Sequence, residues 1–272
     1  MNSAIAQAIN LQTEPVALLL TDEKPERAVQ FEPGKWGCVM SMFGAAATKG
    51  KTAVFDRETY GCFGGGIGLG FGTTYQSFPG GIAGFCNFLS DGNEGWATGE
   101  KIAEGMRAGG AQPEFVHHFL HGERYKKNPE MVKAFVEALP ITEIPTRYAA
   151  FVPLRDVDPA KSEPESVTFV VNPDQFSALV VLACYDRPGL ENVSTPFVAG
   201  CQAIGILSYR EAKSSQPRCI AGLVDLSARK YLRAQTGRDT LTFTMPYRRF
   251  VEMEANVPGS FLQQEPWLTL KG

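Results

Sequence analysis

The stretch Glu165-Ser-Val-Thr-Phe-Val-Val-Asn-Pro-Asp-Gln175 decides the fold class, because it joins two kinds of secondary structure. Val167–Val171 is apolar and rich in β-branched residues, which predicts a buried strand. Pro173-Asp174 follows the strand, and the apolar segment from Phe176 to Cys184 predicts a long helix. A strand that leads directly into a helix is typical of proteins in which the two alternate.

The same alternation extends in both directions along the chain. The sequence predicts a short helix in Met1–Glu14, strands at Val16–Leu20 and Thr52–Phe55, and a helix at Val39–Lys49. Further along it predicts strands at Tyr148–Val152, Cys219–Leu223 and Thr240–Thr244, and helices at Val193–Tyr209, Asp225–Arg233 and Tyr247–Glu254. We therefore expect an α/β fold with a mixed sheet flanked by helices.

Residues 98–140 differ from the rest because they show helical periodicity and no strand pattern. The predicted helices are Thr98–Ala108, Pro113–His121 and Asn128–Leu139. Pro113 and Pro129 stand at first-turn positions, and Asn128 is a good N-cap. Since no segment has the composition of a flexible linker, we expect one α/β domain over residues 1–272 with a helical insert at about 98–140.

Composition limits the classes of protein that the chain can belong to. Hydrophobic residues make up 44% and charged residues 20%, as in ordinary globular proteins. The formal net charge of −3 argues against a nucleic-acid-binding protein, which needs a basic face. Met1–Glu14 is too polar for a signal peptide, and Val16–Leu20 is too short to cross a bilayer. These features predict a soluble cytoplasmic protein whose ligand is a small molecule or a metal, not nucleic acid or a membrane.

Tyr60-Gly-Cys-Phe-Gly-Gly-Gly-Ile-Gly-Leu-Gly-Phe-Gly72 places a thiol in a run where nearly every other residue is glycine. Such a run can hold a phosphate, cradle a metal cluster, or let a neighbouring helix pack closely. The phosphate interpretation is the weakest, because no Gly-Lys-Ser/Thr sequence of a P-loop is present. The positions of the other cysteines help to choose between the two remaining interpretations, a metal cluster and close helix packing.

Three of the six cysteines directly follow a glycine: Cys38, Cys62 and Cys201. Iron–sulfur ligands need backbone N–H groups directed at sulfur, and glycine allows the chain to approach. In a cytoplasmic protein the thiols stay reduced, so a metal site outranks disulfides. The candidate metal ligands are Cys38, Cys62, Cys201 and Cys86, and either Cys86 or Cys219 could complete the set. Cysteine is also a common core residue, which is the preferred interpretation of Cys184.

All three histidines lie within five residues, at His117, His118 and His121. On a helix His117 and His121 share one face with Glu114, a pattern that could hold a metal. A polar helix end, with imidazoles complementing the helix dipole, is the simpler interpretation.

These features together resemble domain-of-unknown-function family 169. The matching segments are Glu14-Pro-Val-Ala-Leu18, Cys38 with the small-residue helix after it, Tyr60–Gly70, Glu165–Gln175, Gly200-Cys201 and Asp225-Leu-Ser-Ala-Arg229. The resemblance implies a shared fold and a shared cysteine–glycine site, and it implies no reaction. It adds weight to Cys38, Cys62 and Cys201 as one functional group.

The leading hypothesis is a protein whose thiolates hold an iron–sulfur cluster or a metal ion for a redox role. The alternative is a non-catalytic binding protein for a small anionic ligand, in which the cysteines only pack. Its ligand-binding groups would be the backbone of Gly64, Gly65 and Gly66 together with Arg229. A thiol-dependent enzyme is a third possibility, for which the sequence shows no assured base.

Overall fold

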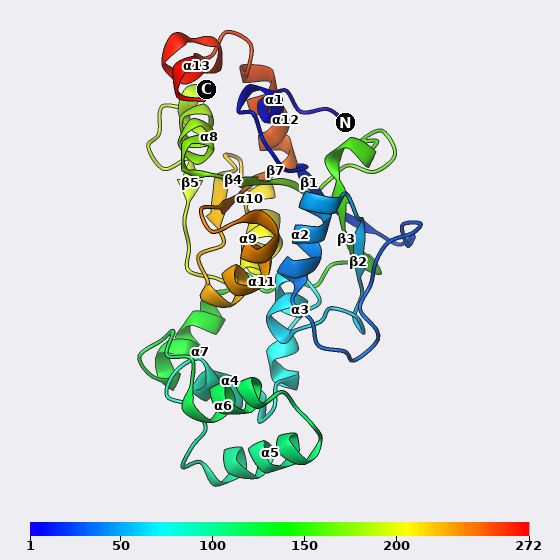
Figure 1. The fold of residues 1–272 in the computed structure, drawn as a ribbon, viewed down its shortest axis with the longest axis vertical. Helices are drawn as coiled ribbons and strands as arrows, with labels where there is room; N and C mark the ends of the chain where they lie inside the picture. The colour runs from blue at the N-terminus through cyan, green and yellow to red at the C-terminus, as the bar shows by residue number, and fades with distance from the viewer. Residues whose placement is uncertain (272) are drawn as a thin grey trace. The chain divides into compact units, whose positions relative to one another are not determined.

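The computed structural model describes residues 1–271, and the chain forms two compact units. Residues 1–72 and 142–271 make the first unit, which contains the sheet, and residues 73–141 make the second, which is built from helices (Figure 1). A mixed sheet with flanking helices confirms the predicted α/β class. The predicted insert at 98–140 lies inside the second unit, and the single-domain description stays a prediction.

A seven-stranded sheet organises the first unit, in the order β2-β3-β1-β4-β7-β6-β5. The strands are β1 (Val16–Thr21), β2 (Ala53–Phe55), β3 (Tyr148–Pro153), β4 (Ser166–Val171), β5 (Val193–Ser194), β6 (Cys219–Gly222) and β7 (Leu241–Pro246). Neighbouring strands are antiparallel except for β5 and β6, which are parallel. The quoted stretch forms β4 near the middle of the sheet, and Asn172 then caps the following helix through a capping box.

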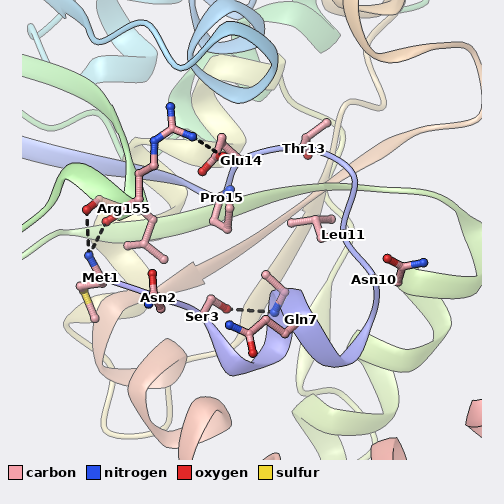
Figure 2. A pocket seen from close by; sticks show the side chains of 12 residues that line it. Met1, Asn2, Ser3, Gln7, Asn10, Leu11, Thr13, Glu14, Pro15 and Arg155 are labelled. Atoms are coloured by element: carbon pink, nitrogen blue, oxygen red, sulfur yellow. Dashed lines mark hydrogen bonds and ion pairs between the residues drawn. The ribbon is translucent and has the colours of Figure 1, made fainter.

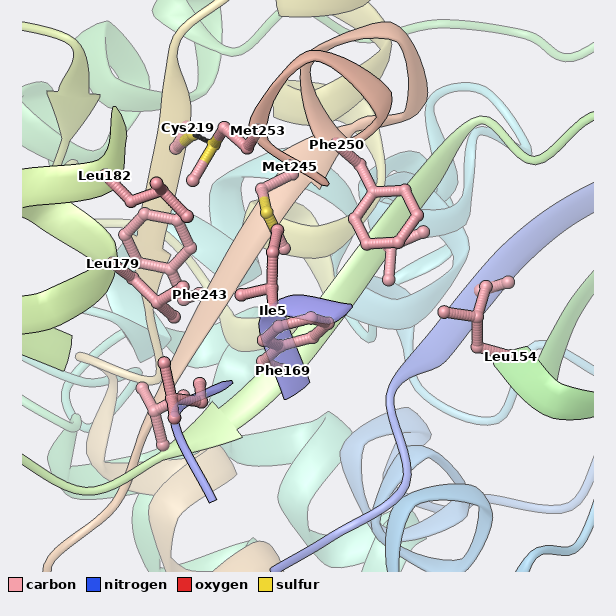
Figure 3. Close-up of a cluster of buried hydrophobic side chains, with 14 of the residues drawn as sticks. Ile5, Leu154, Phe169, Leu179, Leu182, Cys219, Phe243, Met245, Phe250 and Met253 are labelled. Atoms are coloured by element: carbon pink, nitrogen blue, oxygen red, sulfur yellow. Dashed lines mark hydrogen bonds between the residues drawn. The ribbon is translucent and has the colours of Figure 1, made fainter. Parts of the chain in front are cut away.

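One face of the sheet carries the large apolar core. It is covered by α1 (Ala4–Ala8), α8 (Pro173–Tyr185) and α12 (Tyr247–Asn256), with η3 (Phe261–Gln263) and α13 (Glu265–Leu270) following. Phe169 and Phe243 point from adjacent strands into this core, where they meet Leu179 of α8 and Phe250 of α12 (Figure 3). Each of these side chains is fully buried, which stabilises the fold by about 2 kcal/mol per side chain.

The opposite face of the same strands presents small and polar side chains. Side chains alternate along a strand, so Ser166 and Thr168 point away from the apolar core. The Thr168 and Thr244 hydroxyls lie 3.0 Å apart, and the Ser166 hydroxyl donates to the Ile204 carbonyl at 3.3 Å. The helices of this side are α2 (Val39–Lys49), α3 (Phe63–Leu69), α9 (Gly200–Ile204), α10 (Ile206–Ala212) and α11 (Leu226–Thr236) (Figure 1).

The predicted helix at Val193–Tyr209 is wrong over its first part. Val193 and Ser194 instead form β5, which pairs with Cys219 and Ile220 of β6. The helical part begins at Gly200 and is divided at Gly205, whose backbone leaves the helical region. Backbone pairing with β6 outweighs local helix propensity here.

The second unit comprises η1 (Thr74–Ser77), α4 (Gly81–Phe88), α5 (Ala97–Ala108), α6 (Pro113–His121) and α7 (Pro129–Ala138). Phe78 lies at the centre of an aromatic cluster with Phe85, Phe88, Phe115 and Phe119. The predicted bounds of these last three helices agree with the structure to within a residue. Over residues 1–271, none of the helices has the length and apolar character that crossing a bilayer would take.

Candidate functional site

Cys38, Cys62 and Cys201 each lie at the start of a helix in the first unit. Cys38 is the N-cap of α2 and Cys62 the N-cap of α3, while Cys201 is the second residue of α9. Cys38 and Cys62 are partly exposed, whereas Cys201 is buried. Cys38 and Cys62 have the extended backbone of an N-cap, and Gly61 before Cys62 has a left-handed φ of 74° that glycine adopts readily.

The three thiols lie close enough to act on one another electrostatically. The pKa of the Cys38 thiol is raised to about 12, first by burial and then by the charge of Cys62. Burial is also the main cause of the raised pKa of Cys201, followed by the charges of Cys62 and Cys38. The fold therefore gathers thiols from three segments that are far apart in sequence, and it keeps them protonated at neutral pH. We call Cys38, Cys62 and Cys201 the thiol cluster.

Backbone groups of α3 contact two of these sulfurs. The Gly65 N–H donates to the Cys62 Sγ at 3.2 Å, and the Cys201 Sγ donates to the Gly64 carbonyl at 3.3 Å. The N–H groups of Gly65 and Val39 lower the pKa of Cys62, against the larger effect of burial, which raises it. A bound thiolate would keep these donors, which stabilise negative charge on sulfur.

The glycine run forms a helix and is not an open cradle. Gly64, Gly65 and Gly66 have helical conformation within α3, and left-handed φ angles occur only at the flanking Gly61, Gly70 and Gly72. The helical angles at Gly64–Gly66 favour close packing over an open backbone cradle, and binding of a ligand by these three residues stays a prediction. Close packing supplies the reason for glycine: a Cβ on Gly68 would lie 2.7 Å from the Cys201 carbonyl carbon.

Gly65 combines packing with contact to the thiol cluster. A Cβ at this position would lie 2.5 Å from Val39 Cγ2 and 3.3 Å from the Cys62 Sγ. Its N–H is the donor to that same sulfur. The backbone of α3 can therefore approach the cysteines only without a side chain at residue 65.

Asp225, the first residue of the predicted helix Asp225–Arg233, is also a neighbour of the thiol cluster. Its carboxylate accepts from the Ala228 N–H at 2.6 Å, which caps α11, and from the Gly200 N–H at 2.5 Å. Burial raises its pKa, and its charge contributes to the raised pKa of all three clustered thiols. Asp225 thus fixes the start of α9, where Cys201 lies, against α11. The motif at Asp225–Arg229 was the sequence signal for the cap of α11, whereas the bond to Gly200 joins residues 25 apart and has no local signal.

Arg229, the predicted anion ligand, makes several contacts with the backbone. Its guanidinium donates to the carbonyls of Leu223, Thr240 and Arg238, at 3.2, 3.0 and 2.6 Å. These bonds connect the start of α11 to the loop that precedes β7. A role in anion binding stays a prediction.

The other cysteines have different surroundings. Cys219 lies in the apolar core beside Met253, with 3.6 Å between the two sulfurs. Cys184 lies on α8 and accepts from the Asn192 side chain. Cys86 belongs to α4 of the second unit, where burial raises its pKa, and its role as a ligand stays a prediction. Within residues 1–271, no group of three or more His, Cys, Asp or Glu side chains is arranged to hold a metal ion.

The model of DUF169, a family described as an uncharacterised ArCR, matches residues 4–256. The chain belongs to this family. No curated protein matches it, and no solved structure does. The match spans the whole thiol cluster of the DUF169 chain, together with Asp225 and the glycine run of α3.

A polar pocket of about 330 Å³ lies elsewhere in the first unit of the DUF169 chain, between α1 and the segment after β3 (Figure 2). Glu14 and Arg155 form an ion pair at its edge, and Ser3 caps α1 through its hydroxyl. None of the predicted site residues lines this pocket.

Proposed function

We propose that the thiol cluster binds a thiophilic cofactor, an iron–sulfur cluster or a single soft metal ion, and that the protein has a redox role. The observation that carries this proposal is the convergence of three thiols from separate segments, in which the charge of Cys62 raises the pKa of Cys38 and both charges raise the pKa of Cys201. Cys219 and Cys184 act on each other and have Met253 and Asn192 as neighbours, and neither is among the main causes of the raised pKa of the clustered thiols.

The chemistry of the donor atoms suits such a cofactor, although no group of three or more ligands is already arranged around a metal position within residues 1–271. Thiolates select iron–sulfur clusters, zinc and Cu(I) over hard cations. The Gly65 N–H already bonds to the Cys62 Sγ, and N–H bonds to sulfur are among the features that set cluster potentials. Since burial keeps the thiols protonated, loading must release protons, and affinity should rise with pH.

Asp225 acts in this proposal through Cys201. Its bond to the Gly200 N–H holds the start of α9, so that the Cys201 thiol stays near the thiols of Cys38 and Cys62. It is a positioning residue, because both of its carboxylate oxygens already accept backbone bonds.

The alternative, a small anionic ligand bound without redox chemistry, has weaker support. It depends on free backbone N–H groups at Gly64–Gly66 and on Arg229. Gly65 directs its N–H at sulfur, and Arg229 bonds to three carbonyls. A cytoplasmic location and the absence of a nucleic-acid partner remain predictions.

The experiment is metal and sulfide analysis of protein purified without oxygen. The proposal expects near-stoichiometric iron with sulfide, or a stoichiometric soft metal, in the wild type. Cys38→Ala, Cys62→Ala and Cys201→Ala should each lose most of it while remaining folded by circular dichroism. Cys184→Ala is the matched control, because it removes a partly exposed thiol outside the cluster and should retain full loading.

Two results would overturn the proposal. One is colourless wild-type protein with only trace metal after anaerobic purification and reconstitution with iron and sulfide. The other is equal metal loss in Cys184→Ala and in the cluster variants, which would assign the metal to nonspecific thiol binding.

A further inference from the structure

The three histidines of the second unit lie on one helix with unequal surroundings. His118 lies between two carboxylates, with Glu114 at 3.8 Å and Glu123 at 3.7 Å. His117 and His121 stand one turn apart, and their ring centroids are 4.5 Å from each other. The glutamate of the predicted Glu114–His117–His121 set therefore faces His118 instead.

His121 is held in an orientation that suits metal binding. Its Nδ1 lies 3.2 Å from a carboxylate oxygen of Glu94. A carboxylate on one ring nitrogen fixes the tautomer and directs the other nitrogen outward as a ligand, as in many metal sites. This contact leaves the Nε2 of His121 as the ring nitrogen that can face an ion, on the side of α6 that His117 shares.

A pocket of about 360 Å³ adjoins these two rings. It is lined by His117 and His121, by Val116, Leu120, Pro113 and Ala111, and by Arg107 of α5. His118 is not among its lining residues. Both lining histidines are exposed, so an ion from solvent can reach them and the His117 ring has room to turn.

We propose that His117 and His121 form a two-histidine site for a divalent transition metal such as Zn²⁺, oriented by Glu94 and open to the pocket. Two imidazoles at positions i and i+4 of a helix can bind one ion, and imidazole nitrogen suits zinc, copper and nickel. Two protein ligands leave open positions for water or a small ligand in the pocket.

Arg107 sets the expected strength of the site. Its positive charge faces the same pocket and disfavours a bare cation. Zinc affinity should therefore lie in the micromolar-to-millimolar range, and Arg107→Gln should leave it unchanged or strengthen it. This inference is independent of the thiol cluster, whose residues belong to the first unit.

Nitrogen-15 NMR of the histidine rings during a zinc titration at constant pH tests the proposal. The chain contains only three histidines, so single variants assign the three rings. The readout follows imidazoles and excludes zinc bound at thiols. The resonances of His117 and His121 should shift with one common half-saturation point, and those of His118 should not follow. His117→Ala and His121→Ala should abolish the shift of the remaining partner, and Glu94→Gln should weaken binding about tenfold.

His118→Ala is the matched control, because it removes the adjacent imidazole and should keep zinc binding at wild-type strength. The proposal is overturned if no ring responds up to millimolar zinc, or if all three rings respond together. It is equally overturned if His118→Ala abolishes binding, since the ligand pair would then be a different one.

Discussion

Replacing Gly68 by alanine tests whether backbone contact between α3 and α9 holds the thiol cluster together. The added Cβ would lie 2.7 Å from the Cys201 carbonyl carbon, and 2.9 Å from both the Cys201 carbonyl oxygen and the Gln202 nitrogen. These neighbours are backbone atoms, so they cannot move aside by changing a rotamer. The helices must separate, and Cys201 must move with α9.

The expected change in stability follows from two opposing terms. Overpacking a close contact costs about 1–3 kcal/mol, and the backbone clash favours the upper end of that range. Alanine in place of glycine in a helix returns about 1 kcal/mol. The net loss is about 2 kcal/mol, which lowers the Tm of a unit of this size by about 4–8 °C.

Thermal unfolding followed by circular dichroism measures the effect. Gly105→Ala is the matched control, because nothing lies within 4 Å of a Cβ at this helical position. It should stabilise the second unit by about 0.5–1 kcal/mol. A Gly68→Ala variant as stable as the wild type, or more stable, would refute the packing explanation of the glycine run.

Three further predictions follow from the contacts around the sheet. Asp225→Ala removes a helix cap and leaves the Gly200 N–H without its acceptor, so urea denaturation should show that the free energy of unfolding falls by about 2–4 kcal/mol. A fall below about 0.5 kcal/mol would contradict the role of Asp225 in holding α9. The Cys38 thiol has a raised native pKa of about 12 against an ordinary value of 9.0, so the unfolded state loses this proton first. The contribution of the Cys38 thiol to stability is therefore complete below about pH 9 and falls as the pH rises toward 12. The free energies of unfolding of the wild type and of Cys38→Ala, measured by urea titration, should converge over that interval. A constant difference between the two would contradict the raised pKa. Arg249→Ala leaves the carboxylate of Asp186 without the partner that lowers its pKa to about 2, so the free energy of unfolding should fall by about 3–5 kcal/mol. The control Arg248→Ala removes an exposed arginine and should cost under about 0.5 kcal/mol. Similar losses in the two variants would show that Arg249 contributes no more than a surface arginine.

Local signals predicted most of the helices and strands. The Asn128 cap and Pro129 fixed the start of α7, as the structure confirms. The apolar run at Val167–Val171 became β4, whose neighbours on both sides are antiparallel. These elements agree with prediction because capping residues and apolar periodicity act within a few residues of the element they define.

Long-range contacts explain the elements and roles that the sequence left unpredicted. The short strand β5 depends on its pairing with β6, more than twenty residues later. The run at Gly64–Gly66 is helical because α9 lies against it, and local glycine content alone argues against a helix. Cys219 begins an apolar run, a local pattern that does not show where its thiol lies; the register of its strand directs the side chain to Met253. The bond from Gly200 to Asp225 has no sequence signal beyond the N-cap itself.

Cys38, Cys62 and Cys201 are proposed to bind one cofactor together. X-ray absorption at the metal edge of anaerobically loaded protein tests this proposal most directly, because it reports which atoms surround the metal. Scattering dominated by sulfur is expected in the wild type and in Cys184→Ala, and its loss is expected in Cys62→Ala. A metal surrounded only by nitrogen and oxygen in the wild type, or sulfur scattering that persists unchanged in Cys62→Ala, would contradict the proposal.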